Sequence, residues 1–412
     1  MIKILQVRNI DSFVESRRQN TSEKDRKTVK AILNDVRKNG DSAVKKYERK
    51  FNGRQTSQLR VSVKEIKEAR SRISREEVTA LQAMSARLRK SSPKIQIRGP
   101  SKFVPIPSVG CYIPGGEARY PSSVVMSVIP AKIAGVKRIV VVSPPDRDGK
   151  IDPLTIAAAK ICGATEIYKV GGVQAIGALA YGTKSIPKVD KIVGPGGKFV
   201  SIAKSLVSDQ TAIDMIAGPT ELGIIVDANS NPELVALDLI SQAEHSKDTM
   251  CFVITQSKTM AKQIQKSIEK SIPGTERSSI IKESISKNGF IAVCKNENEM
   301  VELANKIAPE HMELMVKNAK SLSKKITGAG LVLIGKNTPS AASDYLLGTN
   351  HILPTNGFGR TRGGLSVLDF LKLQTVVESK KSALRNISKS LNALTNAEDL
   401  PNHYKAVKRR LD

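Results

Sequence analysis

The sequence is poor in aromatic residues and has no apolar run of membrane-spanning length. Its 412 residues include no Trp, 7 Tyr and 8 Phe, so side chains on which nucleic-acid bases could stack are scarce. The longest apolar candidate, residues 123–142, is interrupted by Lys132, Lys137 and Arg138, which argues against a transmembrane helix. The first residues lack the apolar core of a signal peptide. We therefore expect a cytoplasmic protein.

Cysteine is also scarce, and its spacing argues against several classes of site. The four cysteines are Cys111, Cys162, Cys251 and Cys294. None belongs to a C-x-x-C pair, which argues against a zinc finger, a disulfide framework and a dithiol redox site. Three of them lie in or beside apolar runs, where inert, buried thiols are usual. An aldehyde dehydrogenase-like enzyme with a cysteine nucleophile stays open as an alternative, although no cysteine has a histidine or an acid beside it.

Acidic residues are few relative to basic ones, and the formal net charge is +27. The first 100 residues hold 26 Lys and Arg against 11 Asp and Glu. Such an excess keeps a nucleic-acid-binding protein on an enzyme fold open as a second alternative. The basic residues are spaced through helical patterns rather than clustered with aromatics, so a solvated helical surface accounts for them better.

The dinucleotide and P-loop glycine fingerprints are absent, but strand and helix patterns are plentiful. Apolar residues at spacings of three and four predict helices over 25–38, 42–51 and 62–88. Strands and helices then alternate to residue 207 and again from 222 to 334, before a polar helical tail. The clearest elements are strands at 138–143 and 191–193 and helices at 153–162, 198–207 and 297–307. We predict an α/β fold of two doubly wound, Rossmann-like sheet units with a helical N-terminal region and a helical C-terminal tail.

Glycine-rich turns follow several of the predicted strands. Gly171-Gly172 and residues 194–197 lie where strand patterns give way to helix patterns, at the carboxyl ends of a parallel sheet. Doubly wound folds bind ligands at such ends, and a phosphate at a helix N-terminus would suit them. Tight turns without a ligand require the same glycines, so both interpretations stay open.

Histidine is used sparingly, and its positions indicate chemistry. The four histidines each stand in polar company, next to or near an acid or an amide: His245, His311, His351 and His403. Histidine titrates near neutrality and is the commonest metal ligand, so we favour a chemical role for the set over a purely structural one. His311 directly follows Glu310 within residues 308–314, and an imidazole beside a carboxylate provides two proton acceptors.

A candidate metal site can be assembled from residues outside that pair. Gln242 and His245 are three apart near a predicted helix end, so their side chains share one face. Asp344 offers a carboxylate, and Glu398 and His403 are five apart in the tail. A mixed set of nitrogen and oxygen ligands suits zinc better than magnesium or calcium. A polar helix end and an N-cap at Asp344 are the alternatives.

The motifs, in this order, resemble the L-histidinol dehydrogenase family over essentially the whole chain from Val109 onward and more loosely before it. The matching stretches are YIPGG at 112–116, YPSSV at 120–124, VGGVQAI at 170–176, VDKIVGPG at 189–196, IDMIAGPTE at 213–221, SQAEH at 241–245, APEHMEL at 308–314, SDY at 343–345, GTNHILPT at 348–355 and EDLPNH at 398–403. The resemblance implies a zinc-containing homodimer that oxidises L-histidinol to L-histidine by way of the aldehyde, with two NAD⁺.

The resemblance also implies roles for individual residues. One zinc ion per subunit would be held by Gln242, His245 and Asp344, with His403 supplied by the tail of the partner subunit. His311 is implied as the base for alcohol oxidation, and Glu310 as the base for aldehyde hydration. The implied substrate contacts are Thr220, Gln242, His245, His311, Asp344, Glu398 and His403. The implied NAD contacts are Tyr112, Gln174 and Gly197, although the family usually has asparagine where Gly197 stands.

The expected domain division follows from these roles. An N-terminal segment covers residues 1–20. Residues 21–111 and 222–364 are expected to form a first α/β domain with the metal and catalytic residues, and residues 112–221 a second one on the NAD side. The tail, residues 365–412, is too short and too polar to fold alone, so we expect it to dock on the partner subunit.

Overall fold

The computed structural model describes residues 1–18, 22–53, 58–93, 101–115 and 119–412, and the chain divides into two compact units. The first unit comprises residues 1–93 and 105–371, and the second comprises residues 94–104 and 372–412. Within the described ranges, the first unit holds a parallel sheet of five strands and another of six. The predicted α/β fold is therefore confirmed. No helix in those ranges combines the length and the apolar composition needed to cross a membrane.

The five-stranded sheet is built from the middle of the chain. Its parallel strands are β3 (Ser108–Tyr112), β4 (Arg138–Ser143), β5 (Glu166–Lys169), β6 (Lys191–Val193) and β7 (Ala212–Ile213), in the spatial order β5-β4-β3-β6-β7. The helices between them are α6 (Pro121–Ala134), α7 (Pro153–Cys162), α8 (Gly172–Tyr181) and α9 (Lys198–Val207). Along β4, Ile139 and Val141 join one core cluster while Val140 and Val142 join another, because successive side chains of a strand point to opposite faces.

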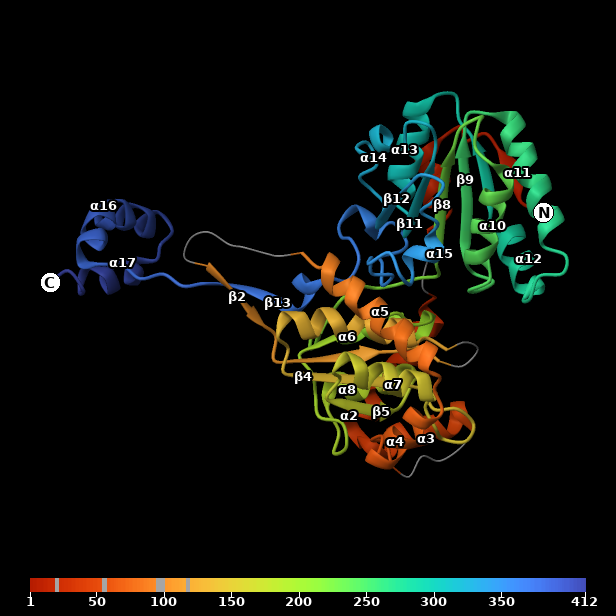
Figure 1. Cartoon of the computed structure of the whole chain (residues 1–412). Helices are drawn as coiled ribbons and strands as arrows, with labels where there is room; N and C mark the ends of the chain where they lie inside the picture. Colours follow the sequence, from red (N-terminus) through yellow and green to blue (C-terminus); the bar gives the residue numbers. More distant parts are fainter. Residues whose placement is uncertain (19–21, 54–57, 94–100, 116–118) are drawn as a thin grey trace. The chain divides into compact units, whose positions relative to one another are not determined.

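The six-stranded sheet is also parallel and has the order β1-β10-β9-β8-β11-β12. Its strands are β1 (Lys3–Leu5), β8 (Glu221–Val226), β9 (Met250–Thr255), β10 (Phe290–Val293), β11 (His311–Met315) and β12 (Leu331–Ile334). Figure 1 shows helices α10 (Pro232–Ala243), α11 (Lys258–Ser271) and α12 (Ser278–Lys287) on one face and α13 (Glu297–Ile307) and α14 (Ala319–Ser323) on the other. Two separate core clusters fill the space between the sheet and these two helix layers.

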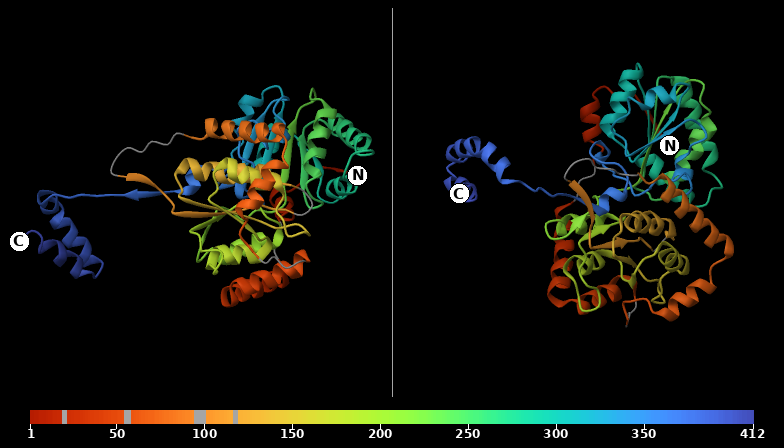
Figure 2. Two further views of the ribbon diagram at one scale, coloured as in Figure 1. Left: turned by 60° about the horizontal axis from the view of Figure 1, so that its bottom comes forward. Right: turned by 60° about the vertical axis from the view of Figure 1, so that its left-hand side comes forward.

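The N-terminal helices pack on the helices that cover the five-stranded sheet, which differs from the domain division expected from the sequence. They are α2 (Glu23–Asn39), α3 (Asp41–Asn52), α4 (Val63–Ser71) and α5 (Arg75–Ser91), drawn in red and orange in Figure 2. Val29, Leu33 and Val36 of α2 join the core cluster that contains α8. Gly177 of α8 allows close approach, because a Cβ there would lie 3.2 Å from Val36 Cβ. An apolar stripe shows that a helix is buried but not which sheet it covers.

The helix expected over 62–88 is two helices, because a second N-cap interrupts it. Helix α4 ends at Ser71, and α5 begins at Arg75. The Ser74 hydroxyl oxygen accepts the N–H of Glu77, and the Glu77 carboxylate accepts the N–H of Ser74. This reciprocal arrangement is a capping box, which starts a new helix. The S-x-x-E pattern at 74–77 is visible in the sequence and could have been used to place the break.

The second unit has little buried apolar surface of its own. It contains most of the paired strands β2 (Ser101–Pro105) and β13 (Leu371–Thr375), followed by α16 (Lys381–Ala397) and α17 (Pro401–Lys408). Thr395 is the buried residue of α16, and none of the described residues of α17 is buried. Leu373, Val377 and Leu394 are more than half exposed. A unit of this size without a core depends on another surface for stability.

Candidate active site

The candidate catalytic pair lies at the amino edge of the six-stranded sheet. Helix α13 ends just before Ala308, which has a φ of 52°, a left-handed conformation that turns the chain toward the sheet. Glu310 follows, and its carbonyl accepts the N–H of Leu331 at 2.9 Å. His311 is the first residue of β11, which pairs with β8 and β12. A central strand therefore positions both side chains.

The Glu310 carboxylate is buried next to the first residue of β8. Its Oε2 accepts the N–H of Glu221 at 3.1 Å. Burial raises the pKa of Glu310 to about 8, although the nearby His311 opposes the rise. A carboxyl group that titrates near neutrality can both accept and return a proton, which is the property required of a general acid–base group.

The His311 ring lies between two carboxylates. Its Nδ1 is 3.9 Å from Glu310 Oε2, and its Nε2 is 3.2 Å from Asp344 Oδ1. Burial alone would lower the pKa of His311, but Asp344 and Glu310 outweigh burial and raise it to about 9. The sequence motif at 308–314 is thus joined to Asp344, which lies more than thirty positions later in the chain.

Hydrogen bonds hold the side chains of Gln242 and Asp344 against each other. Gln242 belongs to the last turn of α10, and Asp344 directly follows α15 (Ser340–Ser343). Gln242 Nε2 donates to Asp344 Oδ2 at 3.2 Å and to Ser340 Oγ at 3.1 Å. Glu313 of β11 fixes the start of α15, because its Oε1 accepts the N–H of Ser340 at 2.6 Å. The helix that carries Asp344 is therefore anchored to the strand that carries His311.

Several polar atoms at this place lack a protein partner. Four buried atoms make no hydrogen bond: Gln242 Oε1, Asp344 Oδ1 and both ring nitrogens of His311. Asp344 Oδ1 and His311 Nε2 are 3.2 Å apart, but their orientation lacks hydrogen-bond geometry. Buried polar atoms normally find a partner. Two such oxygens on side chains that contact each other, one of them on a carboxylate, fit a bound cation.

His245 is the remaining predicted metal ligand of the first unit. It lies two residues beyond the end of α10 and is exposed. Displacement of water by nearby protein atoms lowers the pKa of His245, and the negative charge of Asp344 opposes that change. No cluster of three or more His, Cys, Asp or Glu side chains that could hold a metal occurs in the described ranges. The predicted set contains a glutamine, and His403 belongs to the second unit, so such a cluster is not required within the first unit.

The remaining predicted substrate residues are placed as follows. Thr220 is half-buried directly before β8, and its carbonyl accepts the N–H of Met250 at 2.9 Å. Glu398 directly follows α16 and His403 lies in α17, both in the second unit. The first unit therefore brings Glu310, His311, Gln242 and Asp344 together.

A second cluster lies at the carboxyl edge of the five-stranded sheet. The strand order reverses between β3 and β6, and ligands bind at such a point in doubly wound folds. Tyr112 ends β3, and residues 194–197 follow β6. Gly194 has a φ of 113°, and a Cβ there would lie 2.1 Å from the Tyr112 carbonyl oxygen, so only glycine fits this turn. Gly116 of the YIPGG motif lies outside the described residues.

Among the predicted NAD contacts, one buried polar atom has no hydrogen-bond partner, and one residue has open space around its Cβ position. The Tyr112 hydroxyl oxygen accepts the N–H of Gly172 at 3.1 Å. Gln174 Nε2 donates to Glu48 Oε1 at 2.8 Å, while Gln174 Oε1 is buried without a partner. Gly197 is the N-cap of α9, and nothing lies within 4 Å of a Cβ built there. These features fit a polar ligand at the edge of the sheet.

His351 lies between Asp344 and the first turn of α6. Its Nδ1 lies 2.8 Å from the Asp344 carbonyl oxygen, and its Nε2 lies 3.3 Å from Ser123 Oγ. Ser123 belongs to the first turn of α6, which follows β3. The amino edge of one sheet is thereby linked to the carboxyl edge of the other.

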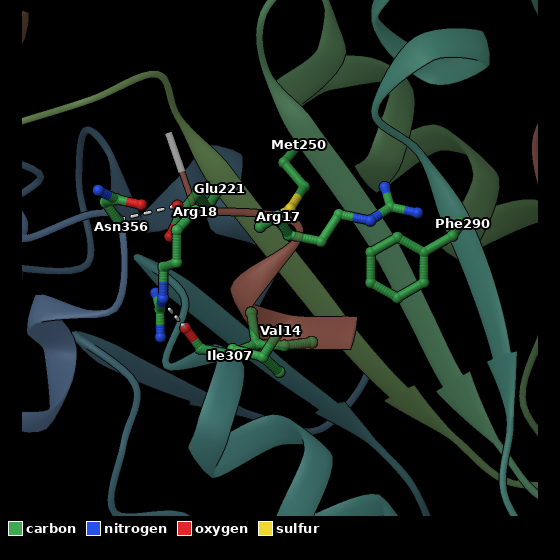
Figure 3. A pocket seen from close by; sticks show the side chains of 8 residues that line it. All are labelled: Val14, Arg17, Arg18, Glu221, Met250, Phe290, Ile307 and Asn356. Atoms are coloured by element: carbon green, nitrogen blue, oxygen red, sulfur yellow. Dashed lines mark hydrogen bonds between the residues drawn. The ribbon is translucent and has the colours of Figure 1, made fainter. Parts of the chain in front are cut away.

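Sequence reasoning missed three residues that support these clusters. Glu48 of α3 is fully buried, and its carboxylate accepts a hydrogen bond from Gln174. It lies four residues after the buried Val44. A charged residue on an apolar helix face is a signal that could have identified it. The other two, Arg18 and Glu221, line one small cavity (Figure 3). Glu221 ends the matched stretch 213–221, whereas no pattern marks Arg18.

The cysteines do not have the properties of a nucleophile. All four are buried. Burial raises the pKa of the Cys162 thiol and of the Cys294 thiol to about 12, and it raises the pKa of Cys111 and Cys251 as well. The thiolate is the reactive form, so these thiols argue against the alternative of a cysteine-dependent aldehyde dehydrogenase-like enzyme.

Known proteins resemble this chain over nearly its whole length. Residues 15–411 match the family model described as histidinol dehydrogenase. The histidinol dehydrogenase of Methanococcus maripaludis is 43% identical over 398 residues, which cover 93% of each chain. That of Methanocaldococcus jannaschii is 44% identical over 397 residues, which cover 93% of this chain and 92% of the other. A crystal structure of histidinol dehydrogenase from Elizabethkingia anophelis has a TM-score of 0.92 and 34% identity, and the match covers 100% of this chain and 98% of that one.

Proposed function

Because the chain belongs to the histidinol dehydrogenase family, and so is an oxidoreductase that oxidises histidinol in histidine biosynthesis, we propose that it works as a zinc enzyme that uses two NAD⁺. The route runs from L-histidinol through the aldehyde to L-histidine. The observation that carries the proposal is the juxtaposition of Glu310 and His311 with the unpartnered oxygens of Gln242 and Asp344.

The proposed metal site is shared between two subunits. Gln242, His245 and Asp344 would hold the ion, together with His403 of the partner subunit. Zinc bound there would hold the imidazole and the amine of the substrate, so that it orients the reacting carbon. Thr220 and Glu398 are proposed as further substrate contacts. The free oxygens of Gln242 and Asp344 support this assignment, and oxygen and nitrogen ligands suit zinc.

His311 is the proposed base for alcohol oxidation. It takes the hydroxyl proton while the hydrogen on the same carbon leaves as hydride, and the product is the aldehyde. The ring must be neutral to accept a proton, yet Asp344 helps to raise its pKa to about 9. A cation bound by Asp344 would offset the negative charge of that carboxylate, and so it would favour the neutral form of the His311 ring.

Glu310 is the proposed base for the second half of the reaction. Its carboxylate takes a proton from water as the water oxygen bonds to the aldehyde carbon, and the carbonyl oxygen takes back the proton that His311 removed from the alcohol, which gives the hydrate and a neutral His311 ring. His311 then takes a hydroxyl proton from the hydrate while a second hydride leaves, and the product is the carboxylic acid. NAD⁺ supplies the hydride acceptor for both oxidations, and Tyr112, Gln174 and Gly197 are its proposed contacts.

The metal assignment predicts the metal content and its effect on turnover. The purified protein should hold about one zinc per subunit at a mixed N/O site. Removal of zinc by a chelator should lower NADH formation from L-histidinol in proportion to the metal removed, and added zinc should restore it. Elemental analysis and initial rates on the same samples measure both quantities. Full turnover in a preparation shown to be metal-free would contradict the proposal.

The NAD assignment predicts that Gly197→Asn strengthens cofactor binding. The N-cap position has a φ of −63° and a ψ of 174°, and the space around its Cβ is open, so asparagine fits and can also cap α9. One added hydrogen bond of about 0.5–1.5 kcal/mol should lower the Kd for NAD⁺ by roughly 2- to 10-fold, measured by equilibrium titration.

Gly196→Asn is the matched control, because it adds the same side chain one position earlier. A Cβ there would lie 2.3 Å from Val200 Cγ1, so this variant should lose cofactor affinity and thermal stability. An unchanged Kd in a folded Gly197→Asn protein would show that the asparagine contact of the family does not carry over to this chain.

A further inference from the structure

Glu221 lies behind the Glu310 carboxylate and has no role in the proposed reaction. It is the first residue of β8, the strand beside β11, and its side chain is buried. Its N–H donates to Glu310 Oε2 at 3.1 Å, and the N–H of Glu310 donates in return to Glu221 Oε2 at 3.3 Å. Each carboxylate is therefore held by the backbone of the other residue.

The second oxygen of Glu221 holds a third segment of the chain. Its Oε1 accepts the N–H of Asn356 at 2.9 Å, as Figure 3 shows. The preceding residue, Thr355, accepts the N–H of Gly218 through Oγ1. One carboxylate thus joins the start of β8, the turn that carries Glu310 and the loop that follows residue 350.

Arg18 supports the same turn from a different direction. Its guanidinium donates to the carbonyls of Lys306 at 2.9 Å and Ile307 at 3.2 Å, which end α13 just ahead of Glu310. Arg18 and Glu221 line a cavity of about 10 Å³ (Figure 3). A cavity of that size holds about one water molecule, so it is not a binding site for a metabolite. The surroundings of Glu221 serve to hold the Glu310 turn.

We infer that Glu221 is a positioning residue for Glu310: its carboxylate holds the Glu310 backbone and the Asn356 loop together and so fixes where the Glu310 carboxylate lies. This inference rests on the proposed role of Glu310 in aldehyde hydration. A base must lie within hydrogen-bond reach of the water it deprotonates, and a displacement of about 1 Å is costly. Alcohol oxidation, in which Glu310 has no proposed part, depends less on this geometry.

The test replaces Glu221 with glutamine. Glu221→Gln keeps the size of the side chain but presents an amide donor where a backbone N–H needs an acceptor. We expect histidinal oxidation to fall roughly 10- to 100-fold in single-turnover assays, with a much smaller change in histidinol oxidation. Glu166→Gln is the matched control, because Glu166 is also the first residue of a parallel strand and its carboxylate pairs with Arg138 at 2.7 Å. That variant should leave the ratio of the two steps unchanged.

A double variant separates the inference from the proposed function. If Glu221 acts through Glu310, adding Glu221→Gln to Glu310→Gln lowers histidinal oxidation no further. Equal loss of both steps in Glu221→Gln, or additive losses in the double variant, would overturn the inference while the proposed function stands. If Glu310→Gln itself spares histidinal oxidation, the proposed function fails and the inference fails with it. Should Glu221→Gln not fold, Glu221→Asp, which keeps the charge but shortens the reach, is judged by the same criteria.

Discussion

Replacement of Glu310 by glutamine is expected to lower histidinal oxidation by roughly 10²–10⁴-fold while histidinol oxidation changes little. Glutamine keeps the shape of the side chain, and its amide oxygen can still accept the N–H that Glu221 now donates to Oε2. It cannot take a proton from water. His311 keeps its place in the alcohol step. Single-turnover measurements of NADH formation, made separately with histidinol and with histidinal, give the two rates.

The pH profile provides an independent check on Glu310. Burial raises its pKa to about 8, and the charged groups that act on it are His311, Asp344 and Glu221. The carboxyl must lose its proton to act as a base, so histidinal oxidation by the parent enzyme should rise as the pH passes about 8. The rise should be absent in Glu310→Gln. Equal losses in the alcohol and aldehyde steps would contradict the proposed division of labour between Glu310 and His311.

Local signals in the sequence predicted much of the secondary structure. The helices expected over 153–162, 198–207 and 297–307 have those bounds in the structure. Proline at the first position of a helix and glycine just after its end mark such bounds, as Pro153 and Gly163 do for α7. The three-residue strand β1 was missed, because so short an edge strand has no periodicity of its own and depends on pairing with β10.

The site could not be assembled from sequence spacing alone. Glu221 and Glu310 are 89 positions apart and exchange backbone hydrogen bonds, and no local pattern encodes such a pairing. Residue types and spacing indicated the candidate ligands and bases, and motif resemblance gave them their roles, whereas the structure adds that Glu310 and His311 stand at an amino edge of a sheet. The residues that hold the site, such as Glu48 and Arg18, belong to the N-terminal region, where charge and periodicity predicted only solvated helices.

Mixing His403→Ala subunits with His245→Ala subunits is expected to restore activity that neither homodimer has. The second unit, which carries His403, exposes Leu373, Val377 and Leu394, so we propose that it docks on the partner subunit. In a two-fold dimer this docking creates two equivalent sites, each completed by the other chain. Each parent homodimer then lacks one metal ligand at both sites and should be nearly inactive.

The heterodimer differs because its two lesions fall in the same site. The site built on the His403→Ala subunit keeps its own His245 and receives an intact His403 from the partner. The other site lacks both histidines. Random pairing of equal amounts gives heterodimers as half of all dimers, each with one intact site, so about a quarter of the parent activity should return. Differently tagged subunits allow the heterodimer to be isolated and its zinc content and NADH formation to be measured.

A second mixture controls for recovery that has another cause. His245→Ala and Asp344→Ala remove ligands that the same subunit contributes, so both sites of that heterodimer remain damaged and the mixture should stay inactive. Activity there would show that mixing itself stabilises the protein. If His403 instead serves its own subunit, the His403→Ala and His245→Ala heterodimer also has two damaged sites. Verified heterodimers of that pair without activity or bound zinc would therefore reject the shared site, whereas recovery confined to that pair requires that the ligand cross the subunit boundary.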